Sequence, residues 1–160
     1  GNARRSGRGP PSLTGTRMTA YIDPSRANFD AFKALPRDEP IHMLNLLRYR
    51  ELAAYPEGHE HHGKGWTGRR AYEEYGKTSG PTFRRTGGKI VWRGAFQTMV
   101  TGPDDMRWDD GFVAQYPNSG AFFQMLKDPD YQRAVANRTA ALADSRLMRF
   151  KPREGGEGFG

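Results

Sequence analysis

The alternation of apolar and polar residues in the last third of the chain predicts strand, helix, helix and strand in close succession. Residues 111–116 form a short β-prone run, and Asn118 after it is a favourable N-cap for a helix with three apolar side chains. Asp128 and the proline behind it suit the end of that helix and the first turn of the next. We expect the second helix to close at 144–145 and residues 146–150 to run out as a strand.

In the first part of the chain, segments with periodic apolar residues are likewise separated by glycine and proline residues. The expected elements are helices at about 26–35 and 68–85 and strands at 41–47 and 89–100. A Gly-Pro pair at 80–81 should kink or break the second helix. Gly94 predicts a bulge or a close backbone approach within the second strand.

This order, with the short first helix as an extension, is strand, helix, strand, strand, helix, strand. It predicts an α+β fold of the ferredoxin-like split βαβ type, with a four-stranded antiparallel sheet and helices on one face. We expect one such domain over residues 18–152. Residues 1–17 are rich in Gly, Pro, Ser and Arg and are expected to be a disordered basic tail, and residues 153–160 a flexible one.

The strand at 41–47 is apolar on both sides. Leu44 lies on one face, together with His42 and Leu46, and Met43, Asn45 and Leu47 lie on the other. We expect the Leu44 side to pack on the helices, with His42 as a structural histidine. The opposite face would then be an apolar surface in water, which a second copy would cover in a symmetric homodimer.

Composition removes several classes of function. The chain has 160 residues and no cysteine, which excludes disulfides and thiolate nucleophiles. The net charge of +7 is concentrated in the first seventeen residues, which hold four arginines and no acid, so it does not indicate a nucleic-acid-binding face. No apolar run is long enough to span a bilayer. We expect a cytoplasmic protein with no nucleic-acid or membrane partner.

Four segments, read together, resemble a known bacterial family. Residues 43–47, 116–122, 128–131 and 144–147 are similar to the domain-of-unknown-function family 1330, of the dimeric α/β-barrel superfamily. The resemblance implies two sheets paired face to face around an internal cavity. It also implies relatives that include cofactorless quinone-forming monooxygenases, muconolactone isomerases and haem-dependent chlorite-degrading enzymes. It carries no catalytic set that transfers to this chain.

Five residues are candidates to touch a ligand. Asn45 is expected on the cavity face, where its amide would orient a ligand carbonyl, unless a neighbouring strand satisfies it. Trp92 and Arg93 are adjacent, so they must point to opposite faces of the sheet, and one of them would face the cavity. Trp92 would form an aromatic wall there, or else belong to the helix-side core. Arg93 would bind an anion there, or else form a surface ion pair. Arg149 would meet a carboxylate or remain solvated, and Tyr72 would cover the sheet.

The segment from Tyr55 to Thr67 contains a cluster of histidines that looks metal-binding. His59, His61 and His62 have a spacing that can chelate, but the glycines around them fix no geometry. We therefore expect a flexible polar loop and no metal.

Together these features predict a dimeric protein with a pocket for a small hydrophobic or aromatic molecule. If it is an enzyme, cofactor-independent monooxygenase or isomerase chemistry is expected, with no cofactor and no catalytic residue assigned. The alternative is a non-enzymatic binding or sensing module that uses the same pocket.

Overall fold

The computed structural model describes residues 19–160, so the predicted disordered tail lies outside the described residues. This part of the chain forms four helices and four strands. In chain order they are α1 (Arg26–Ala34), β1 (Ile41–Tyr49), α2 (Gly68–Arg85), β2 (Lys89–Ala95), β3 (Asp110–Tyr116), α3 (Ser119–Lys127), α4 (Pro129–Ala141) and β4 (Leu142–Phe150).

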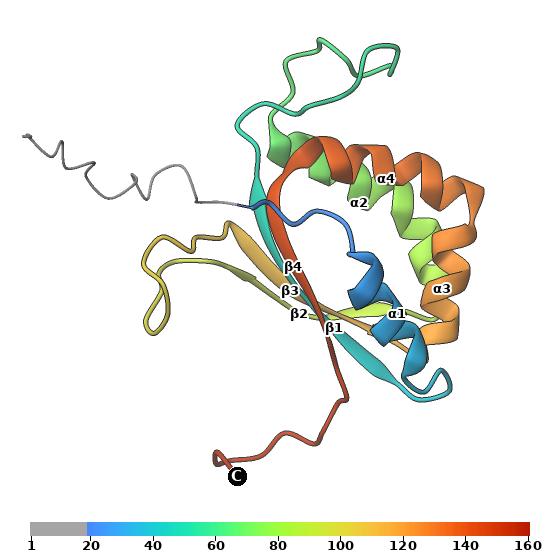
Figure 1. Ribbon diagram of the computed structural model, residues 1–160, viewed down its shortest axis with the longest axis vertical. Coiled ribbons are helices and arrows are strands. Elements are labelled where there is room, and N and C mark those ends of the chain that lie inside the picture. Colours follow the sequence, from blue (N-terminus) through green and yellow to red (C-terminus); the bar gives the residue numbers. More distant parts are fainter. Residues whose placement is uncertain (1–18) are drawn as a thin grey trace, which may run out of the picture.

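The strands form one antiparallel sheet in the order β2-β3-β1-β4. Helices α2, α3 and α4 cover one face of this sheet, and α1 lies beside them (Figure 1). This is the split βαβ arrangement, so the predicted ferredoxin-like α+β fold is confirmed. We call the helix-covered side the inner face and the other side the open face.

The predicted helix caps are present. The Asn118 side chain accepts a hydrogen bond from the Ala121 amide at 2.8 Å and starts α3. Asp128 ends α3 and caps α4, because its backbone N–H donates to Met125 while its carboxylate accepts from the Asp130 amide at 2.8 Å. These local contacts explain how two helices follow each other without a loop.

Two predicted boundaries are wrong, and of the two outcomes predicted at Gly80–Pro81 the break does not occur. Helix α2 continues through Pro81, which lies on the exposed side of the helix. Strand β2 ends at Ala95 rather than at 100, because its partner Asp110 is the first residue of β3. Strand β4 begins at Leu142, so the segment expected to close the second helix already belongs to the strand.

The predicted orientation of β1 is also wrong. Met43 and Leu47 are buried against the helices, with 3% and 1% of their surface exposed. Leu44 and His42 therefore point to the open face, where the His42 ring hydrogen-bonds to Gln115 at 3.2 Å. Both faces of the strand are apolar, so alternation alone did not determine which face the helices cover.

A bulge in β2 sets the direction of the residues that follow it. The register shifts at Val91, between Ile90 and Trp92. Trp92 thus lies on the open face, 52% exposed, with its ring over Gly94; a Cβ on Gly94 would be 2.8 Å from that ring. The bulge predicted at Gly94 is three residues earlier, and the group that approaches Gly94 closely is the Trp92 side chain and not a backbone segment.

In residues 19–160 no helix is both long enough and apolar enough to cross a membrane.

Candidate functional site

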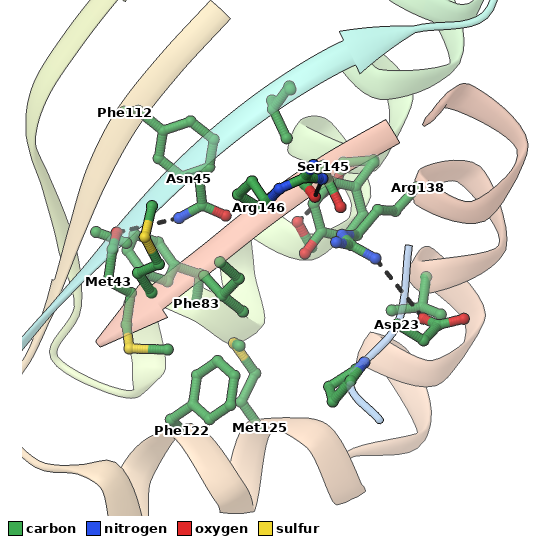
Figure 2. Close-up of a pocket in the computed structure, with 18 of the residues that line it drawn as sticks. Asp23, Met43, Asn45, Phe83, Phe112, Phe122, Met125, Arg138, Ser145 and Arg146 are labelled. Carbon is green, nitrogen blue, oxygen red and sulfur yellow. Dashed lines mark hydrogen bonds and ion pairs between the residues drawn. The ribbon is translucent and has the colours of Figure 1, made fainter. Parts of the chain in front are cut away.

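A cleft of about 2340 Å³ lies between the inner face of the sheet and the helices. Met43 and Phe112 on the sheet and Phe122 and Met125 on α3 give it apolar walls (Figure 2). Its volume exceeds that of most drug-sized ligand sites. The cleft is therefore large enough for a small molecule within a single chain. The family resemblance implied a different cavity, enclosed between the paired sheets of two chains.

Helix α1 closes one side of the cleft and is held at both ends. Before α1, Ser145 and Arg138 donate hydrogen bonds to the carbonyls of Tyr21 and Ile22, at 2.5 and 2.8 Å. After α1, Arg149 donates to the Pro36 carbonyl at 2.9 Å. The aromatic residues of α1 pack on those of α3, since Phe32 lies edge-on to Phe122 with ring centroids 5.5 Å apart.

Four tyrosines line the cleft; we call Tyr72, Tyr75, Tyr116 and Tyr131 the hydroxyl cluster. The hydroxyls of Tyr75 and Tyr131 are 2.8 Å apart and hydrogen-bond to each other. Those of Tyr72 and Tyr116 form no hydrogen bond with a described residue, and neither is among the fully buried atoms that lack a partner. Both hydroxyls are therefore accessible, and water or a ligand in the cleft can bind them.

Burial raises the pKa of all four tyrosines. It is the largest cause in each case, and it raises the pKa of Tyr75 well above the usual range. The pKa of Tyr116 is raised further by its nearness to Tyr131 and Tyr72. The cluster is therefore a set of neutral O–H donors at physiological pH, which is the state suited to stabilising negative charge on a ligand.

Asn45 lies on the inner face and lines the cleft. The predicted cavity was on the face of the sheet that points away from the helices, so Asn45 lines a cavity on the opposite face from the one expected. Its amide nitrogen donates to the Met43 carbonyl at 3.1 Å, and Figure 2 shows the amide beside Phe112. No described residue donates to its amide oxygen. Asn45 therefore offers a free acceptor to the cleft.

Arg93 is on the same side of the sheet. It pairs with Phe112, which in turn pairs with Asn45, so the three residues form one row across β2, β3 and β1. Among residues 19–160, no carboxylate lies within ion-pair distance of Arg93. The positive charge of Arg93 lowers the pKa of Tyr72 and so offsets part of the rise that burial causes.

An acid sits one row away from Asn45. Asp110 accepts hydrogen bonds through the same carboxylate oxygen from Tyr49 at 2.6 Å and from Arg69 at 2.9 Å. No described donor contacts the second oxygen of Asp110. The neighbouring Asp109 accepts a hydrogen bond from the Tyr49 amide at 2.8 Å, and Asp110 lines the cleft.

One of the five predicted ligand residues lies elsewhere, because Trp92 is on the open face and outside the cleft. Tyr72, Asn45, Arg93 and Arg149 all line the cleft. The Arg149 side chain is only 10% exposed, and its Nη2 joins β4 to the end of α1 by contacting Glu39 at 3.4 Å and the Pro36 carbonyl at 2.9 Å. Its Nη1 is buried without a hydrogen-bond partner among the described residues.

The histidine-containing segment is packed, and the prediction of a loop without fixed geometry is wrong. His59 stacks on Tyr55 and His61 stacks on Trp66, with ring centroids 4.6 and 4.1 Å apart. The Tyr55 hydroxyl anchors the segment by donating to Asn137 at 2.6 Å. Within residues 19–160 no three acidic or histidine side chains are placed to hold a metal ion.

Sequence reasoning missed several cleft residues. Tyr116, Tyr131 and Asp110 were not among the predicted ligand residues. Tyr116 and Asp110 occupy alternate positions of β3, both on the inner face. That period-two spacing was the signal available in the sequence, and it became informative only once the inner face was known.

The chain is similar to several solved structures. The chain is 49% identical to the RPA0582 protein of unknown function from Rhodopseudomonas palustris, with a TM-score of 0.78 over 86% of this chain and 100% of the other. The methylated form of that protein gives 49% identity and a TM-score of 0.79, over 88% and 100%. SnoaB from Streptomyces nogalater, a cofactor-independent oxygenase, is 14% identical with a TM-score of 0.46, over 73% and 96%.

No curated protein matches the chain. Residues 66–149, more than half of its length, match the family described as Domain of unknown function (DUF1330). The matched segment begins after α1 and β1, so the closing helix of the cleft lies outside it. The chain therefore belongs to the DUF1330 family.

Proposed function

We propose that the cleft binds a small hydroxylated or carbonyl-bearing aromatic molecule and catalyses proton transfer on it without a cofactor. The observation that carries the proposal is the hydroxyl cluster: four neutral tyrosine donors, two of them without a protein partner, inside an apolar cleft. Such donors stabilise the oxyanion that forms when a proton leaves a carbon next to a carbonyl or leaves a phenol.

Asp110 supplies the base. Tyr49 and Arg69 hold one of its oxygens, which fixes the carboxylate and leaves the other oxygen to accept a proton. In an isomerisation the proton returns to another atom of the same molecule. In a cofactor-independent monooxygenation, the substrate anion reacts with dioxygen, so that a CH₂ group becomes a carbonyl and the second oxygen atom leaves as water. Both reactions share the first proton transfer.

Hydrogen–deuterium exchange tests this shared step. 2-Tetralone, a two-ring ketone with acidic C–H bonds, is incubated with the protein in D₂O and followed by NMR. We expect exchange above the buffer rate, and a loss of about a hundredfold or more in Asp110→Asn, the range typical for a general base. Asp104→Asn, an exposed acid in the β2–β3 connection, is the matched control.

The alternative function, a binding or sensing module, predicts a different result in the same experiment. 2-Tetralone or a phenol would then bind, but exchange would stay at the buffer rate in the wild type and in both variants. That outcome removes the catalytic part of the proposal and leaves the binding site. Equal rates in wild type and Asp110→Asn, both above buffer, remove Asp110 as the base.

We further propose that two chains pair through their open faces. This face carries exposed apolar side chains, among them Trp92, Met148 and Phe150, which are 52%, 38% and 53% exposed. Figure 1 shows that no helix covers it. Two identical flat faces give a self-complementary interface. Light scattering at micromolar concentration should give the mass of a dimer, and Trp92→Glu should give a monomer; a monomeric wild type contradicts the pairing.

A further inference from the structure

We propose that the ligand of the cleft is a hydroxyaromatic carboxylic acid, whose carboxylate is bound by Arg93 and Tyr72 and whose hydroxyl donates to Asn45. This inference rests on the proposed function, because it specifies the chemical class that the same cleft accepts. It follows from which polar groups of the cleft are left without partners.

The Arg93 end of the cleft has donors without acceptors. Arg93 is exposed at the rim of the cleft and has no acidic partner among the described residues, and the Tyr72 hydroxyl has no hydrogen bond there. Asp110, an acid that lines the same cleft, is already held by Arg69 at 2.9 Å. A guanidinium and a neutral hydroxyl that share a site and lack an acceptor fit an anion, and the planar fork of arginine fits a carboxylate in particular.

The Asn45 end has an acceptor without a donor. One N–H of the amide donates to the Met43 carbonyl, which leaves the amide oxygen as an acceptor and the second N–H as a donor. A ligand hydroxyl both donates and accepts, so it can satisfy the amide oxygen, whereas a carboxylate would leave that oxygen without a donor.

The distance between the two ends favours a two-ring ligand. Arg93, Phe112 and Asn45 occupy one row on three neighbouring strands. Two strand spacings separate the ends, about 9.5 Å between backbones. Phe112 lies midway and offers its ring as a surface for the aromatic part of the ligand. A fused two-ring molecule with an acid at one end and a hydroxyl at the other fits this row.

Calorimetry with three probes tests the assignment: 6-hydroxy-2-naphthoate, 2-naphthol without the acid, and 2-naphthoate without the hydroxyl. We expect the hydroxy acid to bind at least about tenfold more tightly than 2-naphthol, the scale of one charge-assisted interaction. Arg93→Gln should remove this difference by weakening the acid alone, and Tyr72→Phe should weaken the acid by a smaller factor. Arg84→Gln, a cleft-lining arginine at the end of α2, is the matched control.

The outcomes separate this inference from the proposed function. If 2-naphthol binds as tightly as the hydroxy acid, or if Arg93→Gln weakens both equally, the carboxylate site is wrong and the cleft remains a site for neutral aromatics. If Arg84→Gln has the same effect as Arg93→Gln, the attraction is general to the positive charge of the cleft and the assignment is overturned. If none of the probes binds, the proposed function fails together with the inference.

Discussion

The buried hydroxyl cluster makes the stability of the fold sensitive to alkaline pH in a way that can be calculated. Burial raises the pKa of Tyr72, Tyr75, Tyr116 and Tyr131 in the folded chain above the ordinary value of 10.0. Above pH 10 the unfolded chain therefore loses these protons while the folded chain keeps them. Because the folded state then binds more protons than the unfolded one, the free energy of unfolding falls as pH rises.

Each tyrosine that stays protonated in the folded chain lowers the free energy of unfolding by about 1.4 kcal/mol per pH unit above 10. Tyr116→Phe removes one such tyrosine. Its hydroxyl has no protein partner, so the variant should match the wild type within about 1 kcal/mol at pH 8. Between pH 8 and pH 11 the free energy of unfolding of the variant should rise by about 1.4 kcal/mol relative to that of the wild type.

Urea unfolding followed by circular dichroism from pH 8 to pH 11.5 measures both curves. Phe83→Leu is the control, because the Phe83 ring packs edge-on to Tyr116 at 5.4 Å but carries no titrating group. Its effect on the free energy of unfolding should be the same at every pH. A constant difference between wild type and Tyr116→Phe across this range would show that the hydroxyl is not held neutral, and would refute the reasoning.

Three further predictions concern the packing around the cleft. Gly68→Ala should destabilise the fold by about 3 kcal/mol or more, since its Cβ would be 2.3 and 2.6 Å from backbone carbonyls. Gly76→Ala in the same helix has open space and should gain about 0.5–1 kcal/mol in urea unfolding; equal effects would contradict the close approach. Tyr55→Phe should cost about 1–3 kcal/mol by leaving buried Asn137 without its donor, and an unchanged melting temperature would argue against that bond. Asp23→Asn should change stability by less than about 0.5 kcal/mol, because its ion pair is long and Asp23 is exposed; a larger loss would show that this pair holds α1.

Local signals in the sequence were enough for the order of the elements. Asn118 and Asp128 are N-caps whose side chains bond to amides two or three residues ahead, so their effect depends on few neighbours. For the same reason the predicted first helix agrees closely with α1, where Ser25 caps the helix. Short-range chemistry of this kind can be read without knowing the fold.

The face of the sheet that meets the helices was not readable in this way. Strand β1 is apolar on both sides, so Leu44 and Met43 were equally good candidates for the core. The bulge at Val91 then decides which of Trp92 and Arg93 enters the cleft, and a bulge depends on the partner strand. The candidate site was predicted in part for this reason: Asn45, Arg93 and Tyr72 share the cleft, while Trp92 does not.

The tyrosine hydroxyls show a second limit. Tyr75 and Tyr131 are 56 residues apart and meet only because α2 and α4 pack together. Nothing in the spacing of either residue indicates the other. The packed histidine segment is a similar case, since Tyr55 is fixed by Asn137 from α4. A site whose residues come from several helices and strands can be recognised only when the tertiary structure is known.

The most direct test of the account is a crystal structure of the protein soaked with 2-naphthol, the probe that lacks the proposed carboxylate. We predict ordered density for the ring system within the cleft, with its oxygen within hydrogen-bonding distance of Asn45 or of a hydroxyl of the cluster. Density for the probe between the open faces of two chains, with only water beside Tyr72 and Tyr116, would contradict the assignment of the cleft as the binding site.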